Sequence, residues 1–321
     1  MVLSCIATQK DSGRRAVDVL IRHTGMSHYL GKKIRLYGNL EVNGRFQRMI
    51  DPVRAGDQIR AIYVADGELP EGARLRNTAG IQICFQDDWL LVVDKPPHML
   101  THPAFNGQHD SLTTLLSEYN LHPVNRLDRG TSGLIVLARN GHAHHILGKE
   151  KMSKEYLGLV HGRPKSETGS VDLPIARMKD SIILREINAD GKPSLTRYAT
   201  ERTFSLPTRA DNIPICSLLR FSLETGRTHQ IRVHCAALGT PLIGDGLYGH
   251  AERIEGADNP QVVRLLEKQI DRQALHACRL AFSHPITKEP LEIRSMMPSD
   301  MVRLTRTAER LSQRTESAIT P

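Results

Sequence analysis

One short segment, NRLDRGTSG at residues 125–133, concentrates side chains that could do chemistry. Asp128 stands between Arg126 and Arg129, in a turn rich in glycine and hydroxyl residues. A carboxylate beside guanidinium groups stays ionised at neutral pH, because the opposite charge favours its charged form. Such a carboxylate can act as a nucleophile or as a base. The residues alone leave open the alternative that Asp128 only caps the turn.

Two other segments carry side chains that would serve such a carboxylate. In ETGRTHQIR at 224–232, we expect Arg227 at a strand-to-helix corner, from where a bidentate contact would hold Asp128 charged and oriented. In KEYLGLVHG at 154–162, Tyr156 on a strand could stack its ring on a nucleobase. The alternatives are a surface arginine and an ordinary core or edge tyrosine.

The sequence lacks several other kinds of catalytic machinery. It has no phosphate-binding loop, no dinucleotide-binding glycine motif, no zinc-protease motif and no GxSxG nucleophile motif. Its five cysteines are too scattered for a CxxC site, which predicts no metal and reduced thiols in a cytoplasmic protein. A carbohydrate-cleaving enzyme would need a second catalytic carboxylate, and only Asp128 is convincing.

The composition bounds the class of protein. The 321 residues are 40% apolar and 24% charged, so the chain can build a folded core and is long enough for two domains. No run of about 18 apolar residues occurs, which predicts that no helix spans a membrane. The 43 Lys and Arg exceed the 35 Asp and Glu, and the resulting formal charge of +8 permits a polyanionic partner.

Residues 1–65 have the pattern of a small α/β unit. Ser12 and Ser27 are placed to cap two helices, and Asn43-Gly44 is a strong hairpin signal. The second helix carries three cations that we expect to contact phosphates, with a solvated helix face as the alternative: Lys32, Lys33 and Arg35. Residues 66–80 are rich in Gly, Pro and charge and are expected to form a linker.

Residues 81–305 have the pattern of one larger domain, followed by a tail at 306–321. Apolar runs predict strands at 81–85, 89–93, 133–138, 154–161, 218–223 and 274–282. Helical patterns follow Ser111 and Thr228 as caps and also occur at 142–152 and 260–270. Because strands and helices do not alternate regularly, we expect an α+β fold with a mixed, mainly antiparallel sheet.

Seven motifs, in order along the chain, resemble the pseudouridine synthases of the large-subunit ribosomal RNA A type. They are VVDKPPHMLTHP (92–103), RLDRGTSG (126–133), KEYLGLVHG (154–162), DGKPSLTRY (190–198), TGRTHQIRVH (225–234), PLIGDGLYG (241–249) and LHACRLAFSHP (275–285). Residues 14–64 resemble the S4-like RNA-binding module that often precedes this catalytic domain. The resemblance implies cofactor-free isomerisation of uridine to pseudouridine in ribosomal or transfer RNA, in a central RNA-binding cleft.

The same resemblance implies roles for individual residues. Asp128 would be the catalytic carboxylate, Arg227 the arginine that pairs with it, and Tyr156 the ring that stacks on the target base. Four further residues would contact the substrate: Arg126, which would hold the flipped-out RNA, Ile231 as an apolar wall of the base pocket, Arg129 and Thr131. The sequence leaves open whether the carboxylate attacks the sugar, adds to the ring or removes a ribose proton.

Two positions depart from the family pattern. Asn125 replaces the usual His before RLD, and His98 stands where a small residue is common. We expect activity to survive, while the packing of the 125–128 loop and its RNA contacts are in doubt. A non-catalytic RNA-binding or ribosome-assembly protein with the same fold is the alternative function. We expect a monomer with neither DNA nor membrane as a partner, and the sequence does not identify the target uridine.

Overall fold

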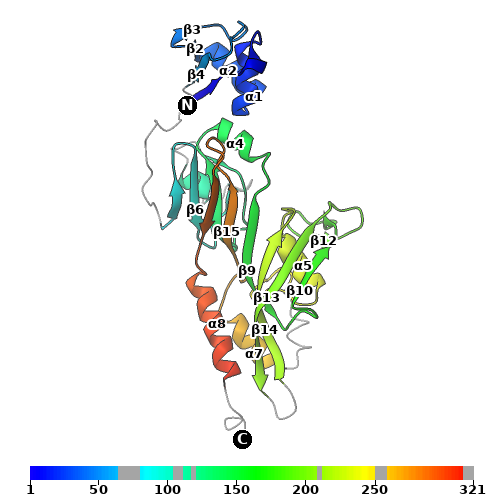
Figure 1. Cartoon of the computed structure of the whole chain (residues 1–321). Coiled ribbons are helices and arrows are strands. Elements are labelled where there is room, and N and C mark those ends of the chain that lie inside the picture. The colour runs from blue at the N-terminus through cyan, green and yellow to red at the C-terminus, as the bar shows by residue number, and fades with distance from the viewer. Residues whose placement is uncertain (64–79, 104–110, 117–120, 208–211, 250–258, 314–321) are drawn as a thin grey trace, which may run out of the picture.

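The computed structural model describes residues 1–63, 80–103, 111–116, 121–207, 212–249 and 259–313 (Figure 1). In these ranges the strands form a four-stranded sheet, a ten-stranded sheet and a two-stranded ribbon. Strands β8 and β15 of the large sheet are parallel, and the other described strand pairs are antiparallel. The structure therefore confirms the predicted α+β class with a mixed, mainly antiparallel sheet.

The N-terminal unit, in blue at one end of the molecule in Figure 1, contains the small sheet and two helices. Its elements are β1 (Val2–Ile6), a 3-10 helix (Gln9–Asp11), α1 (Ala16–Thr24), α2 (His28–Tyr37), β2 (Asn39–Val42), β3 (Arg45–Phe46) and β4 (Gln58–Ile62). Helix α1 buries Ala16, Val19 and Leu20 completely, as the spacing of its apolar residues predicts. These side chains share one apolar core with the sheet.

The local signals in this unit are partly confirmed. The Ser27 side chain accepts a hydrogen bond from the Leu30 N–H at 3.1 Å, so it caps α2 as expected. Asn43 and Gly44 form the turn between β2 and β3, both with positive φ, of 50° and 75°. The expected Ser12 cap is wrong, because the N-cap residue of α1 is Arg15, which makes no side-chain cap bond. The predicted linker at 66–80 lies, except for Gly80, outside the described residues.

The large sheet runs in the order β10-β13-β14-β9-β15-β8-β6-β5, with β16 and β7 paired beside this path. Its strands are β5 (Gln82–Gln86), β6 (Leu90–Lys95), β7 (His122–Pro123), β8 (Ser132–Ala138), β9 (Ser153–His161), β10 (Thr168–Asp172), β13 (Leu195–Pro207), β14 (Asn212–Leu223), β15 (Leu275–Ser283) and β16 (Pro290–Arg294). Every residue of β8 is buried, which agrees with its uninterrupted apolar sequence. The ribbon of β11 (Ile175–Arg177) and β12 (Arg185–Ile187) lies outside this sheet.

Gly133 explains how β8 comes so close to β15. A Cβ atom at this position would lie 2.3 Å from the Ala277 carbonyl oxygen, and the residue has a φ of 115°. Only glycine accommodates both the contact and this backbone conformation. The parallel pairing of the two strands at this point therefore places the loop at residues 125–131, which carries Asp128 and leads into β8, beside β15.

The remaining helices are α3 (Leu112–Leu115), α4 (Gly141–Leu147), α5 (Gln230–Ala237), α7 (Pro260–Glu267) and α8 (Ser299–Ser312). Ser111 caps α3 as expected, through a 3.1 Å bond from the Thr114 N–H. The expected Thr228 cap of α5 is wrong, because the N-cap residue is His229, in the left-handed region with a φ of 58°. The long β13–β14 hairpin was predicted only for its part at 218–223.

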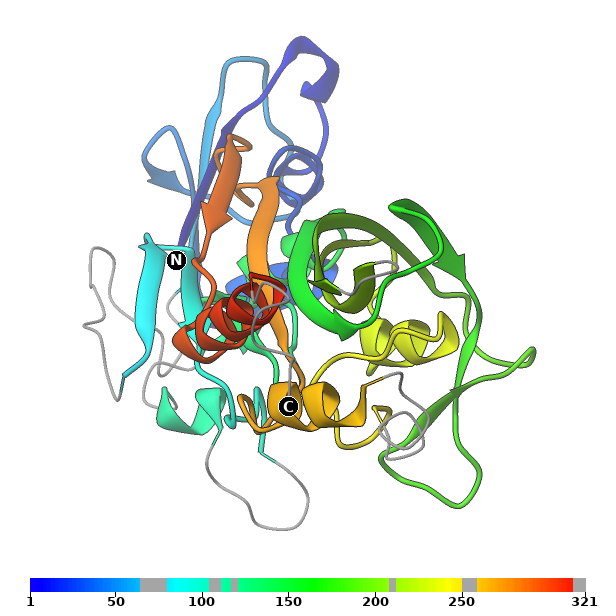
Figure 2. The same cartoon turned by 90° about the horizontal axis from the view of Figure 1, so that it is seen from below.

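Helix α8 corrects the predicted tail. Residues 306–312 continue a helix whose Met301, Leu304, Ala308 and Leu311 side chains are buried in a common apolar cluster. Figure 2 shows α8, in red, close to α7, in orange, and the two helices contact each other. The apolar spacing of three and four residues was outweighed in the sequence by the many polar residues between 305 and 321.

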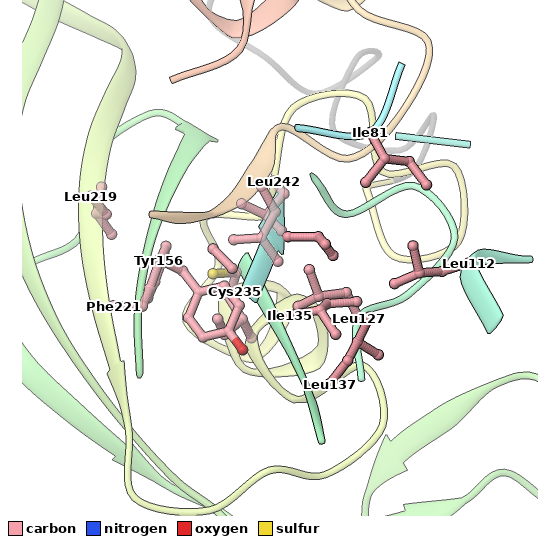
Figure 3. Close-up of a cluster of buried hydrophobic side chains, with 14 of the residues drawn as sticks. Ile81, Leu112, Leu127, Ile135, Leu137, Tyr156, Leu219, Phe221, Cys235 and Leu242 are labelled. Carbon is pink, nitrogen blue, oxygen red and sulfur yellow. The ribbon is translucent and has the colours of Figure 1, made fainter. Parts of the chain in front are cut away.

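A second apolar cluster lies where the large sheet meets α5. Figure 3 shows Tyr156 and Phe221 from neighbouring strands beside Cys235 of α5, together with Leu127 and Ile135. These residues belong to the buried cluster that also contains Ile231, the first-turn residue of α5. This packing fixes the start of α5 against β9 and against the loop that precedes β8.

Leu311→Ala tests the assignment of α8. If residues 306–312 pack as described, the substitution should lower the free energy of unfolding by about 2–5 kcal/mol, because it removes a buried aliphatic side chain. Urea unfolding measures this loss. Arg310→Ala, at an exposed position of the same turn, is the matched control and should change stability by less than about 0.5 kcal/mol. Equal stabilities of the two variants would support a disordered tail instead.

Candidate active site

A small pocket of about 60 Å³ lies between the loop before β8, strand β9 and the start of α5. It brings together six of the predicted site residues: Arg126, Asp128, Thr131, Tyr156, Arg227 and Ile231. Arg129 does not line this pocket, and its Nε donates a 3.2 Å hydrogen bond to the His98 carbonyl. The proximity of the six is now a structural fact, whereas their roles stay predictions.

The loop that carries Asp128 is fixed by hydrogen bonds on both sides. The Thr131 N–H donates to the Asp128 carbonyl at 3.1 Å and closes the turn. The buried Thr101 hydroxyl donates to the Leu127 carbonyl at 3.0 Å and accepts from the Leu127 N–H at 3.2 Å. Thr101 belongs to the segment after β6, so two distant parts of the chain position the carboxylate.

Arg232, and not Arg227, is the arginine that contacts the carboxylate. Its Nη1 lies 3.4 Å from Asp128 Oδ2. Its Nε and Nη2 donate to the two oxygens of Asp245 at 2.8 and 2.7 Å, a bidentate pair that fixes the guanidinium plane. The side chains of Arg232 and Asp245 are only 6% and 1% exposed, whereas that of Asp128 is 19% exposed. One buried guanidinium thus links a structural carboxylate to the one that faces the pocket.

The expected contact between Arg227 and Asp128 is therefore wrong in its choice of arginine. Arg227 is exposed, and its Nε donates to the Pro193 carbonyl at 3.2 Å. His229 has a left-handed conformation and is the N-cap residue, so α5 begins at Gln230. The first turn of the helix then carries Ile231 and Arg232 to the pocket, while Arg227 remains at its rim. Arg232 therefore contacts the carboxylate from within α5, whereas Arg227 lies before the helix.

A histidine and a tyrosine complete the surroundings of Asp128. His229 Nε2 lies 3.8 Å from Asp128 Oδ2, and His229 Nδ1 lies 2.8 Å from the Tyr248 hydroxyl. Burial lowers the pKa of His229, so its ring is mainly neutral at pH 7. The Arg232 guanidinium lies 5.1 Å from the centre of the Tyr248 ring, within range of a cation–π contact. Tyr248 thereby contacts both Arg232 and His229, which lie beside the carboxylate.

Sequence reasoning missed four members of this group: His229, Arg232, Asp245 and Tyr248. Two of them stand in PLIGDGLYG, which was recognised only as a motif and given no role. The Asp245 carboxylate also accepts the N–H groups of Leu247 and Tyr248, at 3.0 and 3.2 Å. An Asp side chain that accepts backbone N–H groups just beyond it is typical of a turn, and this turn signal could have identified Asp245 in the sequence.

Tyr156 is a buried phenol facing the same pocket. Burial, followed by the negative charge of Asp128, raises the pKa of Tyr156 well above its ordinary value. The side chain is consequently neutral at physiological pH and presents an uncharged ring. This geometry agrees with the expectation of a stacking surface, and the adjoining Ile231 adds an apolar wall.

Lys95 is a buried cation next to the loop that carries Asp128. Its Nζ donates to the carbonyls of Pro96, Met99 and Arg129 at 2.8, 2.9 and 3.4 Å, and so ties the segment after β6 to the residue next to Asp128. Burial, reinforced by the Arg272 cation, lowers the pKa of Lys95 from 10.5 to about 7. The charge of this lysine therefore changes within the neutral to alkaline range.

The two departures from the family pattern lie outside the pocket lining. The Asn125 amide accepts the Val136 N–H at 2.8 Å and donates to the Leu134 carbonyl at 3.3 Å, so it binds the backbone of β8. His98 has a φ of 62° and its ring lies 3.3 Å from a carboxylate oxygen of Asp271. Asn125 thus has a defined structural function in loop packing.

The predicted RNA-contacting cations lie on α2 of the N-terminal unit. Lys32 and Arg35 are exposed. Lys33 is half-buried, with its Nζ 5.2 Å from the centre of the Tyr29 ring and 5.9 Å from that of Tyr63. Two of the three cations are therefore exposed to solvent, and their contact with RNA phosphates stays a prediction.

Neither a metal site nor a membrane-spanning helix occurs among the described residues. No group of three His, Cys, Asp or Glu side chains in these ranges is placed to hold a metal ion. No helix in the same part of the chain is both long and apolar enough to cross a membrane.

Comparison with known proteins decides the family. The model of the RNA pseudouridylate synthase family matches residues 89–237, which include all the pocket-lining residues except Leu275. Ribosomal large subunit pseudouridine synthase D of Vibrio cholerae is 37% identical over 315 residues, which cover 93% of each chain. The chain belongs to the RNA pseudouridine synthase family. An uncharacterized RNA pseudouridine synthase of Bacillus subtilis, YjbO, is 34% identical, with 83% of this chain and 89% of that protein covered.

Membership confirms the predicted enzyme class, an isomerase that forms pseudouridine in RNA. Two solved structures show the same fold. Human RNA pseudouridylate synthase domain containing 1 aligns with a TM-score of 0.52 at 23% identity, covering 74% of this chain and 98% of that chain. Human RNA pseudouridylate synthase domain containing 4 gives a TM-score of 0.51 at 22% identity, covering 71% and 92%.

Arg232→Lys and Arg227→Ala distinguish the two arginines of this synthase. A lysine keeps one positive charge but cannot bind Asp245 with two parallel hydrogen bonds. Arg232→Lys should therefore lower the rate of pseudouridine formation at saturating RNA by about 100-fold, the loss that a misplaced reacting group can cause. Arg227→Ala should act mainly on KM. Single-turnover assays measure both, and a larger loss of rate in Arg227→Ala would contradict the assignment.

Lys95 gives a prediction for the dependence of stability on pH. Below about pH 7 the lysine is charged in both states, and the folded state bears the full cost of burying the charge. Between about pH 7 and 10.5 the unfolded chain retains the proton that the folded chain has lost, so the Lys95 contribution should raise stability with increasing pH. Urea unfolding at both ends of this range should show the rise in the native protein relative to Lys95→Met. Parallel curves for the two proteins would refute it.

Proposed function

We propose that Asp128 is the catalytic carboxylate of this synthase and that its substrate is large-subunit ribosomal RNA. The observation that carries the catalytic part is the 3.4 Å contact between the Asp128 carboxylate and the buried Arg232, inside a pocket that Tyr156 also lines. The names of the similar proteins from Vibrio species support the choice of RNA.

The reaction breaks the bond between N1 of uracil and C1′ of ribose and forms a bond between C5 and C1′. The C5 proton is released and N1 gains a proton, so the product is an isomer of the substrate. A base within a structured RNA must first leave its stack, at a cost of roughly a few kcal/mol. Asp128 can act on the extruded nucleotide because Arg232 places a positive charge 3.4 Å from its Oδ2 and limits its orientation.

The other pocket residues have complementary functions in this proposal. Tyr156 stacks on the uracil ring as a neutral phenol, because its raised pKa keeps the proton on the hydroxyl. Ile231 forms the apolar wall, and Thr131 lines the pocket beside the catalytic loop. Arg126 is exposed at the rim, where it can occupy the position that the extruded base leaves. The chemistry then requires one ionised carboxylate held in place, with no cofactor.

We further propose that residues 1–65 form a separate S4-like RNA-binding domain, joined to the catalytic domain by residues 66–80. Its apolar core, whose buried members all lie between Leu3 and Tyr63 and against which Trp89 packs, supports folding of this unit. The exposed Lys32 and Arg35 of α2 supply positive charge for RNA phosphates. The five cysteines are free thiols, which supports a cytoplasmic location.

Asp128→Asn tests the catalytic proposal. The amide has nearly the same shape and cannot act as a carboxylate, so pseudouridine should disappear from the target sites. The measurement is pseudouridine mapping of total RNA from a deletion strain complemented with either the native or the variant gene. Asp172→Asn, at an exposed position of β10, is the matched control and should restore every site. Survival of all sites in the deletion strain or with Asp128→Asn would support the non-catalytic alternative.

A further inference from the structure

A second, larger groove adjoins the proposed active site. It has a volume of about 520 Å³ and lies between the β11–β12 ribbon, the loop before β13 and the loop before α5. Arg227 lines both this groove and the pocket that contains Asp128. Figure 1 shows β12 beside α5, the helix that carries Arg232. The groove is therefore continuous with the rim of the pocket.

The groove is strongly basic. Four of its lining residues are cationic and one is acidic: Arg177, Arg185, Lys192, Arg227 and Asp190. Within the described ranges, none of the four cations lies within 4.0 Å of a carboxylate oxygen. Other surface arginines of the same chain do have such partners, for example Arg202 with Glu309 and Arg220 with Glu201. The four cations of the groove thus carry positive charge that no carboxylate of the described residues neutralises within that distance.

The ribbon places two of these cations directly opposite each other. Arg177 of β11 and Arg185 of β12 are cross-strand partners, so their side chains leave the same face of the ribbon. Directly opposed like charges destabilise a strand pair. An anion bound between them would remove the repulsion and make the arrangement favourable. The Glu186 side chain lies on the other face by the alternation of the strand, so it does not neutralise this pair.

We propose that this groove binds the phosphodiester backbone of the RNA strand next to the uridine that enters the pocket. An extruded nucleotide stays attached to its neighbours through phosphates, so the strand must leave the pocket across its rim, where Arg227 lies. Beyond the rim, Arg185, Arg177 and Lys192 offer a row of cations without a base-reading pattern. Contacts of this kind fix the register of the strand and carry no sequence information. The inference rests on the proposed function only in taking RNA as the substrate.

Arg177→Glu combined with Lys192→Glu tests the groove. Both proteins to be compared carry Asp128→Asn in the full chain, so no turnover disturbs the measurement. The probe is a short fluorescein-labelled RNA hairpin with uridines in its loop, followed by fluorescence anisotropy over a salt series. The Kd should rise by about tenfold or more, and the slope of log Kd against log salt should fall by about 1.4, at about 0.7 per lost phosphate contact.

The matched control is Arg163→Glu combined with Lys165→Glu. These two cations are exposed on the loop after β9 and line neither cavity. The groove variant should also unfold at the same or a higher temperature than its parent, because Arg177→Glu replaces a repulsive cross-strand pair by an attractive one. Lower RNA affinity with undiminished stability would separate binding from misfolding.

The outcomes distinguish this inference from the proposed function. If the groove variant loses no more affinity than the control, the groove does not bind the RNA strand, whatever the mapping of pseudouridine shows. If the groove variant alone loses affinity while the mapping shows no dependence on Asp128, the catalytic proposal fails and the groove assignment stands. In the otherwise native enzyme, the groove variant should raise KM more than it lowers the rate at saturating RNA.

Discussion

A single buried guanidinium is the constraint on which the active site depends. Arg232 binds Asp245 with two hydrogen bonds and reaches Asp128 with its remaining nitrogen. Taking a carboxylate such as Asp245 out of water is costly unless it is paired, and removing one partner of a buried pair leaves an uncompensated charge. The fold must therefore hold the start of α5 and the turn at Asp245 together. As a consequence, the Arg232 guanidinium is held in a fixed position beside Asp128.

Other elements hold this arrangement in place from a distance. Glu267 of α7 accepts the Gly244 N–H with both oxygens, at 3.2 and 3.1 Å, directly before Asp245. On the other side, Arg272 donates to the Gly130 carbonyl at 2.8 Å and pairs with Asp300 of α8 at 2.7 and 3.0 Å. The C-terminal helix thereby supports the loop that carries Asp128. Residues 306–312 of the same helix are held by the burial of Ala308 and Leu311.

Much of the fold was predictable because its signals are local. The Ser27 cap, the Asn43-Gly44 turn and the apolar run of β8 each depend on a few neighbouring residues, and each is confirmed. The buried face of α8 was missed, because its apolar partners, such as Leu159 and Phe204, lie far along the chain. A local propensity cannot register such contacts.

The site was predictable in its membership and less so in its connections. Six of the seven residues expected at the catalytic or base pocket line one pocket, because short motifs recorded which residues occur together. Motifs do not record which arginine faces which carboxylate. In the structure Arg232 lies in the first turn of α5 and contacts Asp128, while Arg227 precedes the helix and donates to the Pro193 carbonyl. The central ion pair is thus a tertiary contact that the motif does not record.

The most direct test of this account is the single-turnover rate of Asp245→Asn at saturating RNA. Asp245 is buried and holds the Arg232 guanidinium that contacts Asp128, so it is a positioning residue. The account predicts a rate loss of about 10- to 100-fold with little change in RNA affinity, and partial recovery in Asp245→Glu. Assays well below the unfolding temperature of each variant separate this effect from lost stability. A rate equal to that of the native enzyme in folded Asp245→Asn would contradict the account.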